Sequence, residues 1–338
     1  MSPSNTKDDC SSRDIKSALS KLSKEARELY LGHNIPALHS APAPLSFYRD
    51  FVSQNRPVVI KGGVSHWSAV TKWTNAYLKE RLGDMPVSVT VTPNGYADAP
   101  QGSLFVMPEE RTMCMGDFVD ILENPESANG VFYIQKQNSN LTQEFKDIMG
   151  DIEADIDWAT EAFGKTPDAA NFWMGDARAV TSSQQIFYKS VSNILFSVHK
   201  DPYENIYCVV RGTKEVVLQP PTDLPWVPYR DFKPAIYKEN IKTGEFEMEE
   251  INSSLVPWIA IDPTSPDLET YPEYANSTQF KLKLEAGDVL FLPSLWFHYL
   301  TQSHGCIAVN FWYDMEFDIK YNYFNLVNKL KKIIRSKD

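Results

Sequence analysis

Three residues of the sequence have the types and spacing of a metal site. His199 and Asp201 are two apart in "FSVHKDPYENIY", and residues i and i+2 of a strand share a face. His298 lies in "AGDVLFLPSLWFHYL", an apolar and aromatic strand pair. Two histidines and one carboxylate leave three positions of Fe(II) open for a bidentate cosubstrate and dioxygen. The alternative is that His298 is a hydrogen-bonded core histidine and His199 belongs to a surface turn.

Lys214 strengthens the case for a ligand site. In "KEVVL" it shares strand parity with Val216 and Leu218, so a strand here directs its ammonium into the core. A buried lysine with no acidic residue on its own strand face is costly unless an anion binds it, and a dicarboxylate supplies that anion. In the opposite parity Lys214 is solvated and Glu215 is buried, which is less favourable.

Polar residues also interrupt two other apolar strands. Asn310 lies in "CIAVNFWY", where its amide must find hydrogen-bond partners. Tyr133 and Gln135 occupy alternate positions of "FYIQKQ" and therefore present a phenol and an amide to one face. Together these residues predict a polar lining inside a small β-barrel.

The pattern of the chain changes at about residue 130. Before it, helical spacing of apolar residues predicts helices at 14–31, within 41–55, at 72–84 and at 115–124, and strands are expected at 56–62 and 86–93. Residues 1–13 are polar and are expected to be loose. After residue 130, short β-type runs separated by turn residues indicate a barrel or sandwich, and the basic tail from residue 321 is expected to be helical.

These patterns predict four parts of the chain. They are a polar segment and helix at 1–40, an α/β flank at 41–128, a β domain at 129–318 and a C-terminal helix at 319–338. The β domain contains a long insertion at 222–278, rich in proline, tryptophan and acidic residues. An insertion of that length is usually functional or packed as a lid. Its acidic residues, such as Glu249, Glu250 and Asp267, are candidates for attracting a lysine.

Composition narrows the class of protein. The 338 residues are 43% hydrophobic and 12% aromatic, which supports a substantial core. The net charge of −11 argues against non-specific nucleic-acid binding and favours a basic polypeptide as partner. We find no apolar run of the roughly 20 residues that span a bilayer and no secretory signal. The four cysteines form no CxxC pair and indicate free thiols in the cytosol, with the nucleus as a second location.

The motifs "HKDPYENIYCVVRGTK", "GDVLFLPSLWFH" and "CIAVNFWYDMEFDIKYNYF" resemble those of the JmjC hydroxylases, which are Fe(II)- and 2-oxoglutarate-dependent oxygenases. The likeness is to a branch described as protein lysyl hydroxylases and extends from about residue 40 to residue 330. It implies a mostly β fold, a double-stranded β-helix (cupin or jelly-roll) with an N-terminal α/β extension and a C-terminal helix. It also implies C-hydroxylation of a lysine in a protein, with dioxygen consumed and succinate and carbon dioxide released.

The resemblance assigns roles to individual residues. It makes His199, Asp201 and His298 the iron ligands, and it makes Lys214 and Tyr133 the residues that hold the distal carboxylate of 2-oxoglutarate. Asn205 and Asn310 would lie beside the cosubstrate near the metal. Gln135 and Trp312 would border the substrate groove. It further implies a translation-associated GTPase as a protein substrate and a homodimer formed through the C-terminal helix.

One departure from the family pattern concerns residues 183–197. In the resembling branch "AVTS" leads almost directly into the HxD motif, and its threonine helps to hold the cosubstrate. Here "AVTS" ends at residue 182, so the matching Thr181 is separated from the motif and Phe196 takes its place before His199. The segment is either a real loop or an unspliced in-frame intron of a gene model. The abrupt interruption of an otherwise intact motif favours the second explanation.

Other functions remain open at this level. The same oxidant can remove a methyl group from methyl-lysine, although no zinc module typical of chromatin readers is visible. A cupin-like binding protein with an inactive metal site is the non-enzymatic alternative. Proteolysis has no support in the sequence, which contains neither a protease triad pattern nor an HExxH motif.

Overall fold

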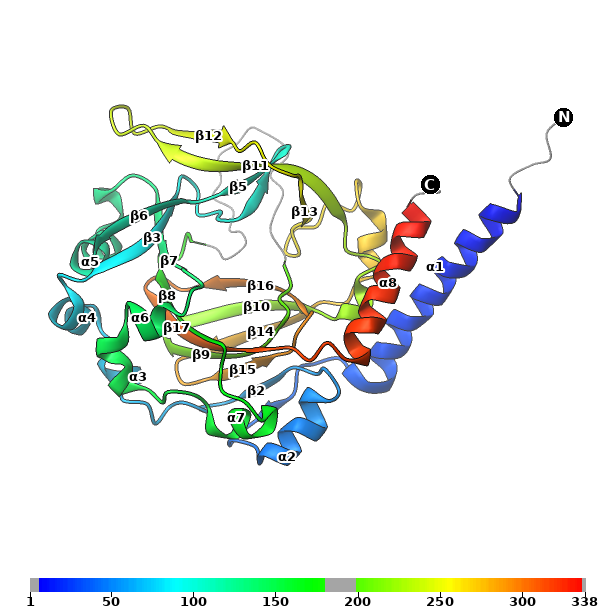
Figure 1. Ribbon diagram of the computed structural model, residues 1–338, viewed down its shortest axis with the longest axis horizontal. Coiled ribbons are helices and arrows are strands. Elements are labelled where there is room, and N and C mark those ends of the chain that lie inside the picture. The colour runs from blue at the N-terminus through cyan, green and yellow to red at the C-terminus, as the bar shows by residue number, and fades with distance from the viewer. Residues whose placement is uncertain (1–5, 180–198, 336–338) are drawn as a thin grey trace.

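The computed structural model of the protein describes residues 6–179 and 199–335, which form two facing sheets flanked by helices (Figure 1). Within this part of the chain, nine strands make the main sheet. In spatial order they are β1 (Ala37–Leu38), β2 (Val58–Ile60), β15 (Val289–Leu292), β9 (Tyr203–Arg211), β17 (Cys306–Asp314), β8 (Ala169–Gly175), β7 (Val131–Ile134), β3 (Pro86–Thr92) and β6 (Glu109–Cys114). The smaller sheet contains β14 (Phe280–Glu285), β10 (Thr213–Gln219) and β16 (Phe297–Gln302).

Alternating side chains divide the core into two layers. In β9, Tyr207 and Val209 pack in the interior between the sheets, whereas Ile206 and Cys208 pack under the helices. This period of two is what a sheet buried on both faces requires. The smaller sheet closes the interior with residues such as Val216 of β10. The double-stranded β-helix predicted from the sequence is thus confirmed.

Helices cover the outer face of the main sheet. They are α2 (Pro44–Phe47), α3 (Ala69–Lys72), α4 (Asn75–Leu82), α5 (Met115–Glu123), α6 (Asn140–Gln143) and α7 (Asp157–Phe163), with short turns η2 (Tyr48–Val52), η3 (Pro125–Ser127) and η4 (Lys146–Asp151). Buried side chains such as Phe47 of α2, Leu78 of α4 and Phe118 of α5 pack against strand residues such as Phe172. Their burial anchors the helices to the strands that carry the site.

Two long helices lie side by side at one end of the molecule (Figure 1). They are α1 (Thr6–Ala26), continued by the π-helical turn η1 (Arg27–Leu31), and α8 (Ile319–Arg335). The expectation that residues 1–13 are loose is wrong for residues 6–13, because the helix already begins at Thr6, and residues 1–5 lie outside the described part of the chain. The stretch from residue 4 to residue 31 contains neither glycine nor proline, so nothing in it interrupts a helix.

The expected insertion at 222–278 is folded mainly as strands. It contains η5 (Pro221–Asp223), β11 (Tyr229–Glu239), β12 (Phe246–Glu250), β13 (Val256–Ile259) and η6 (Pro272–Asn276). β11 pairs with β12, β13 and β5 (Leu104–Met107), and β5 pairs with β4 (Ala99–Gln101). Figure 1 shows this sheet as a separate layer beside the barrel. The insertion is thus a folded part of the molecule with regular strands.

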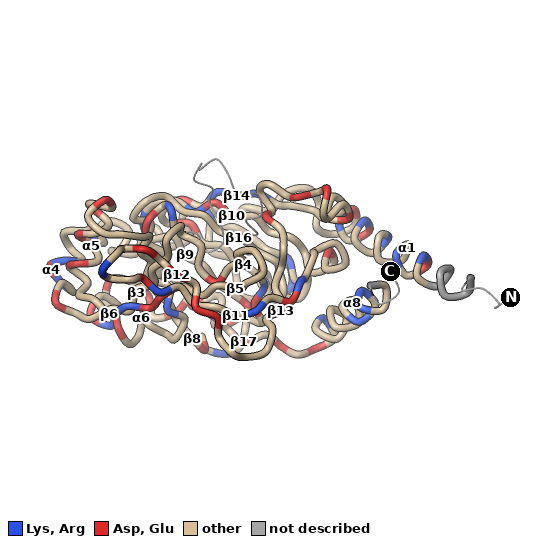
Figure 2. Tube along the Cα trace, turned by 90° about the horizontal axis from the view of Figure 1, so that it is seen from above, with Lys and Arg blue, Asp and Glu red and all other residues tan. Residues whose placement is uncertain are grey.

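Charged residues of both signs lie along α1, whereas those within α8 are all lysine or arginine, as Figure 2 shows. Among the described helices, none combines the length and apolarity needed to cross a bilayer. Cys114, Cys208 and Cys306 are free thiols, as predicted.

A buried carboxylate, Asp151, joins the helices on the outer face. Its partners are Ser68, Lys72, Trp73 and Tyr77. Although burial acts to raise it, these hydrogen bonds lower the pKa of Asp151 from 3.8 to about 2. Because the pKa is lower in the folded state, the stabilisation is complete above pH ~4 and is lost as the pH falls towards 2.

We therefore expect Asp151→Asn to lower the free energy of unfolding by about 1–2 kcal/mol at pH 7. Urea denaturation at pH 7, 4 and 3 measures the effect, and the difference from the wild type should shrink at the lowest pH. Glu80→Gln, an exposed change on α4, is the control. An equal difference at every pH would contradict the role of the carboxylate charge.

Candidate functional site

Strand pairing places the two candidate histidine ligands opposite each other. The N–H of His199 donates to the carbonyl of His298 at 3.3 Å, and the N–H of His298 donates back to His199 at 2.9 Å. Directly opposed residues of an antiparallel pair point to the same face. Their rings consequently lie with centroids 4.1 Å apart.

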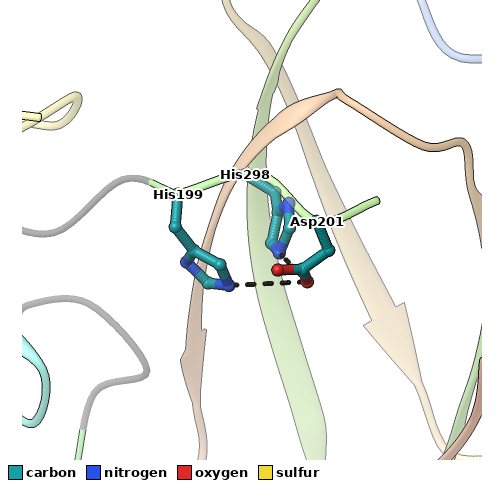
Figure 3. A group of neighbouring side chains, drawn as sticks. All are labelled: His199, Asp201 and His298. Carbon is teal, nitrogen blue, oxygen red and sulfur yellow. Dashed lines mark ion pairs between the residues drawn. The ribbon is translucent and has the colours of Figure 1, made fainter. Parts of the chain in front are cut away.

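Asp201 completes the group from an irregular segment (Figure 3). The expectation that the HxD motif lies on a regular strand is wrong, because His199 forms an isolated bridge and β9 begins only at Tyr203. Pro202 has no N–H to continue a ladder. The carbonyl of Asp201 instead accepts the N–H of Leu295 at 2.9 Å, which fixes the segment beside the turn that precedes β16.

The three side chains converge on one point. Asp201 Oδ2 lies 3.8 Å from His199 Nε2 and 3.5 Å from His298 Nε2. Ligand atoms of all three residues lie within 4.8 Å of one another. His298 Nδ1 is 3.0 Å from the carbonyl of Trp296, so it carries the proton and leaves Nε2 as the free lone pair. Burial, with a smaller effect of His298, lowers the pKa of His199 to about 4. These donors fit a divalent iron.

Lys214 lies in the interior of the barrel, as strand parity predicts. Its side chain is 1% exposed, and its Nζ donates to Gln302 Oε1 at 2.6 Å and to Tyr133 Oη at 3.3 Å. Burial acts to lower the pKa of Lys214, but the phenols of Tyr133 and Tyr207 raise it above its usual value. No carboxylate of a described residue lies within ion-pair distance of this ammonium. The positive charge is therefore available to an anion.

An amide network connects the main sheet to the metal end of the cavity. Asn310 Nδ2 donates to Asn205 Oδ1 at 3.1 Å, and Asn310 Oδ1 accepts from Trp173 Nε1 at 2.7 Å and from Asn171 Nδ2 at 3.3 Å. These bonds fix both amide orientations. Among the described residues, none accepts a hydrogen bond from the amide nitrogen of Asn205.

Two cavities meet at the candidate ligands. The inner one has mixed polar and apolar walls; its lining is Gln137, Trp173, His199, Asp201, Asn205, Tyr207, Leu290, Leu292, His298, Leu300, Asn310 and Trp312. Lys214 does not line it but lies with Nζ 5.8 Å from the centroid of the Tyr207 ring. The outer cavity is a cleft of about 830 Å³ that β11, β13 and α8 enclose beside His199 and Asp201.

Of the two residues expected at the substrate groove, Trp312 lines a cavity of the site and Gln135 does not. Trp312 lines the inner cavity and stacks on Tyr203, with ring centroids 4.9 Å apart. Gln135 is buried just after the end of β7 and lines neither cavity, whereas Gln137 does line the inner one. Thr181 and the segment 183–197 lie outside the described residues.

Three acidic residues of the insertion that the sequence analysis named as candidates, Glu249, Glu250 and Asp267, do not reach the site. Glu250 lies on β12 and pairs with Lys233 at 3.3 Å, and Glu249 is exposed on the same strand. Asp267 caps a turn by accepting from the N–H groups of Glu269 and Thr270. None of the three lines either cavity.

Two of the site residues that were missed in the sequence are Tyr207 and Gln302. Tyr207 lies two positions after Asn205 on β9 and therefore shares its face. Gln302 lies four positions after His298 on β16 and shares the face of that histidine. Counting alternate positions outward from each candidate ligand is the signal that would have found both.

Comparisons with known proteins agree with this geometry. Residues 44–319 match the family described as a cupin-like domain. The chain is 45% identical to the human bifunctional peptidase and (3S)-lysyl hydroxylase JMJD7, over 94% of this chain and 96% of the relative. It is 38% identical to the lysine-specific demethylase JMJ32 of Arabidopsis thaliana, over 92% and 91%, and 36% identical to the JmjC domain-containing protein E of Dictyostelium discoideum, over 94% and 96%. The chain thus belongs to the cupin-like family of JmjC-domain proteins.

Proposed function

We propose that the protein is an Fe(II)- and 2-oxoglutarate-dependent hydroxylase that hydroxylates a carbon of a lysine side chain in a protein. The observation that carries the proposal is the combination of a His-Asp-His donor group with a buried lysine that has no carboxylate partner among the described residues. The lysyl hydroxylase activity in the name of the human relative supports the choice of substrate. The chemistry supplied by bound iron and 2-oxoglutarate is insertion of one oxygen atom of dioxygen into a C–H bond, with release of succinate and carbon dioxide.

Side chains of the barrel interior hold the cosubstrate. Lys214 binds its far carboxylate through a charge-assisted hydrogen bond, and Tyr133 donates beside it. Asn205 offers an amide donor near the metal end, and Asn310 keeps that amide in orientation. Trp312 covers the cavity wall next to these groups and excludes water from it.

The outer cleft provides the place for the substrate lysine. Trp258 borders it beside His199, with ring centroids 6.4 Å apart, and supplies apolar surface for an aliphatic side chain. Apart from the candidate ligand Asp201, Asp231 is the acidic residue among the described residues that line the cleft. Its exposed carboxylate is available to the ammonium of the substrate.

Incubation of the enzyme with Fe(II), 2-oxoglutarate and lysine-containing peptides, read by tandem mass spectrometry, tests the proposal. A gain of one oxygen atom on a lysine carbon is the expected result. Removal of a methyl group from methyl-lysine peptides, with no product from the unmodified ones, would replace hydroxylation by demethylation. Peptide cleavage is visible in the same spectra and would indicate peptidase activity. Peptides from a translation-associated GTPase are the first to test.

Replacement of Asp231 should weaken substrate binding without affecting the cosubstrate. We expect Asp231→Asn to raise KM for a lysyl peptide about 2–5-fold, as for an exposed ion pair. KM for 2-oxoglutarate should stay unchanged, and steady-state kinetics measure both values. Glu249→Gln removes an equal charge outside the cleft and is the matched control. An unchanged KM for the peptide would contradict the role of Asp231.

We also propose that the protein forms a homodimer through α8 and the residues before it. Phe317, Ile319, Tyr323 and Leu326 are large apolar side chains exposed there. Contiguous apolar surface of this kind is typical of protein interfaces. Light scattering during size exclusion should give a dimer mass for the wild type and a monomer mass for Leu326→Asp. Lys329→Ala is the control, and a monomeric wild type would refute the proposal.

A further inference from the structure

Gln302 is the cross-strand neighbour of Lys214. In the antiparallel pair of β10 and β16 the two residues lie directly opposite each other, and Leu218 lies opposite His298 in the same pair. Opposed side chains of such a pair point to one face. β16 therefore carries the candidate ligand His298 near its start and, at its end, Gln302, which accepts a hydrogen bond from the Lys214 ammonium.

The orientation of the Gln302 amide is fixed by its two hydrogen bonds. Nε2 donates to the main-chain carbonyl of Asp176 at 3.0 Å, and a carbonyl can only accept. Oε1 must therefore be the atom that faces Lys214, from which it accepts at 2.6 Å. The side chain is 7% exposed, so a different orientation would leave buried polar atoms without partners.

The carboxylate of Asp176, the residue whose carbonyl anchors Gln302, is bound by Arg178. Both oxygens of Asp176 accept from Arg178, whose Nε and Nη2 donate at 2.9 and 2.6 Å to one oxygen and whose main-chain N–H donates at 2.8 Å to the other. Burial acts to raise the pKa of Asp176, but Arg178 holds it below its usual value. Asp176 thus meets Gln302 only through its main chain, and its charge is compensated by the guanidinium.

We propose that Gln302 is a positioning residue that orients the ammonium of Lys214 and leaves its charge uncompensated, so that the site selects 2-oxo dicarboxylic acids over 2-oxo monocarboxylic acids. Its neutral amide satisfies one N–H of Lys214 without compensating the charge, so only a ligand with a second carboxylate can pair with the ammonium. This inference rests on the proposed function, because it assumes that Lys214 meets the far end of 2-oxoglutarate.

Gln302→Glu is the informative substitution because it keeps the size of the side chain and adds a charge. The new carboxylate pairs with Lys214 in a low-dielectric site and competes with the far carboxylate of the ligand. Affinity for 2-oxoglutarate should fall about 10–100-fold, the range for a hydrogen bond to a charged group. Affinity for 2-oxopentanoate, which has the same carbon chain without the second carboxylate, should not fall.

Gln302→Met separates positioning from charge. It removes the acceptor but leaves the ammonium uncompensated, so the preference for the dicarboxylic acid should persist. Affinity for 2-oxoglutarate should drop a few-fold because Lys214 then keeps only phenol partners to orient it. Gln143→Glu, an exposed change on α6, controls for added negative charge.

The experiment is calorimetry of the full-length protein saturated with Mn(II), titrated separately with 2-oxoglutarate and with 2-oxopentanoate. The selectivity is the dissociation constant of 2-oxopentanoate divided by that of 2-oxoglutarate. A fall in this selectivity of at least about tenfold in Gln302→Glu, but not in Gln302→Met or Gln143→Glu, supports the inference. An unchanged selectivity in Gln302→Glu overturns it. If Gln302→Glu fails to bind Mn(II) and so has lost its fold, Gln302→Met decides, and wild-type affinity in that variant overturns the inference. Failure of the wild type to bind 2-oxoglutarate would instead refute the proposed function.

Discussion

Asp201→Ala is expected to abolish tight binding of a divalent metal. The substitution removes the only carboxylate of the candidate donor group and leaves His199 and His298, which cannot hold iron in place by themselves. Affinity should fall by more than about 100-fold, since loss of an outer partner of a ligand alone costs 10–100-fold. Mn(II) is the probe, and its electron paramagnetic resonance signal distinguishes free from bound ion.

The control for this experiment is Glu215→Gln. Glu215 is exposed on the outer face of β10, so its loss changes the net charge equally without touching the site. The thermal unfolding temperature without metal should be similar in both variants and in the wild type. Wild-type Mn(II) affinity in Asp201→Ala would show that the ion binds elsewhere.

Lys214→Met is expected to separate cosubstrate binding from metal binding. Methionine fills a similar volume but cannot pair with a carboxylate, so 2-oxoglutarate affinity should fall about 10–100-fold. Affinity for Mn(II) should not change, because none of the candidate ligands contacts Lys214. Calorimetry with each ligand measures the two constants separately.

The same substitution has a predicted effect on stability. Lys214 carries a buried charge held by neutral partners, so replacing it by an apolar side chain should not lower the unfolding temperature of the ligand-free protein. The further increase in that temperature when 2-oxoglutarate is added to the Mn(II)-loaded protein should become smaller. A large loss of stability without ligands would mean that Lys214 has a structural role. Retained stabilisation by 2-oxoglutarate would contradict its role in binding.

Predictions from the sequence were most accurate where the period-two alternation of a strand determined on which face a side chain lies. Strand parity placed Lys214 inside the barrel, and the alternation on β9 and β17 follows from a sheet that is buried on both faces. The proximity of His199 and His298 was predicted from residue types, but its cause is the pairing of the HxD segment with β16. Such a long-range register is set by the whole fold and cannot be counted from local sequence.

The parts that were missed lacked a local signal of that kind. β11 spans eleven residues but mixes charged, aromatic and proline side chains, because it is sandwiched between other strands over only part of its length. Gln302 was missed because a glutamine near a strand end usually faces solvent. Its role depends on Lys214, which is 88 positions away in the chain.

The pairing of β10 with β16 also restricts which substitutions could alter the length of the oxo acid that the site accepts. Side chains on one face of a strand recur only every second residue, at intervals of about 6.8 Å. A lysine moved by one position on β10 would point away from the interior, and one at Val216 would stand a whole interval nearer to His298. A diacid whose length falls between these two positions finds no same-face residue of β10 at which a lysine could meet its far carboxylate. Acceptance of a shorter or longer diacid would therefore require a cation from another strand, and point changes along β10 would not provide it.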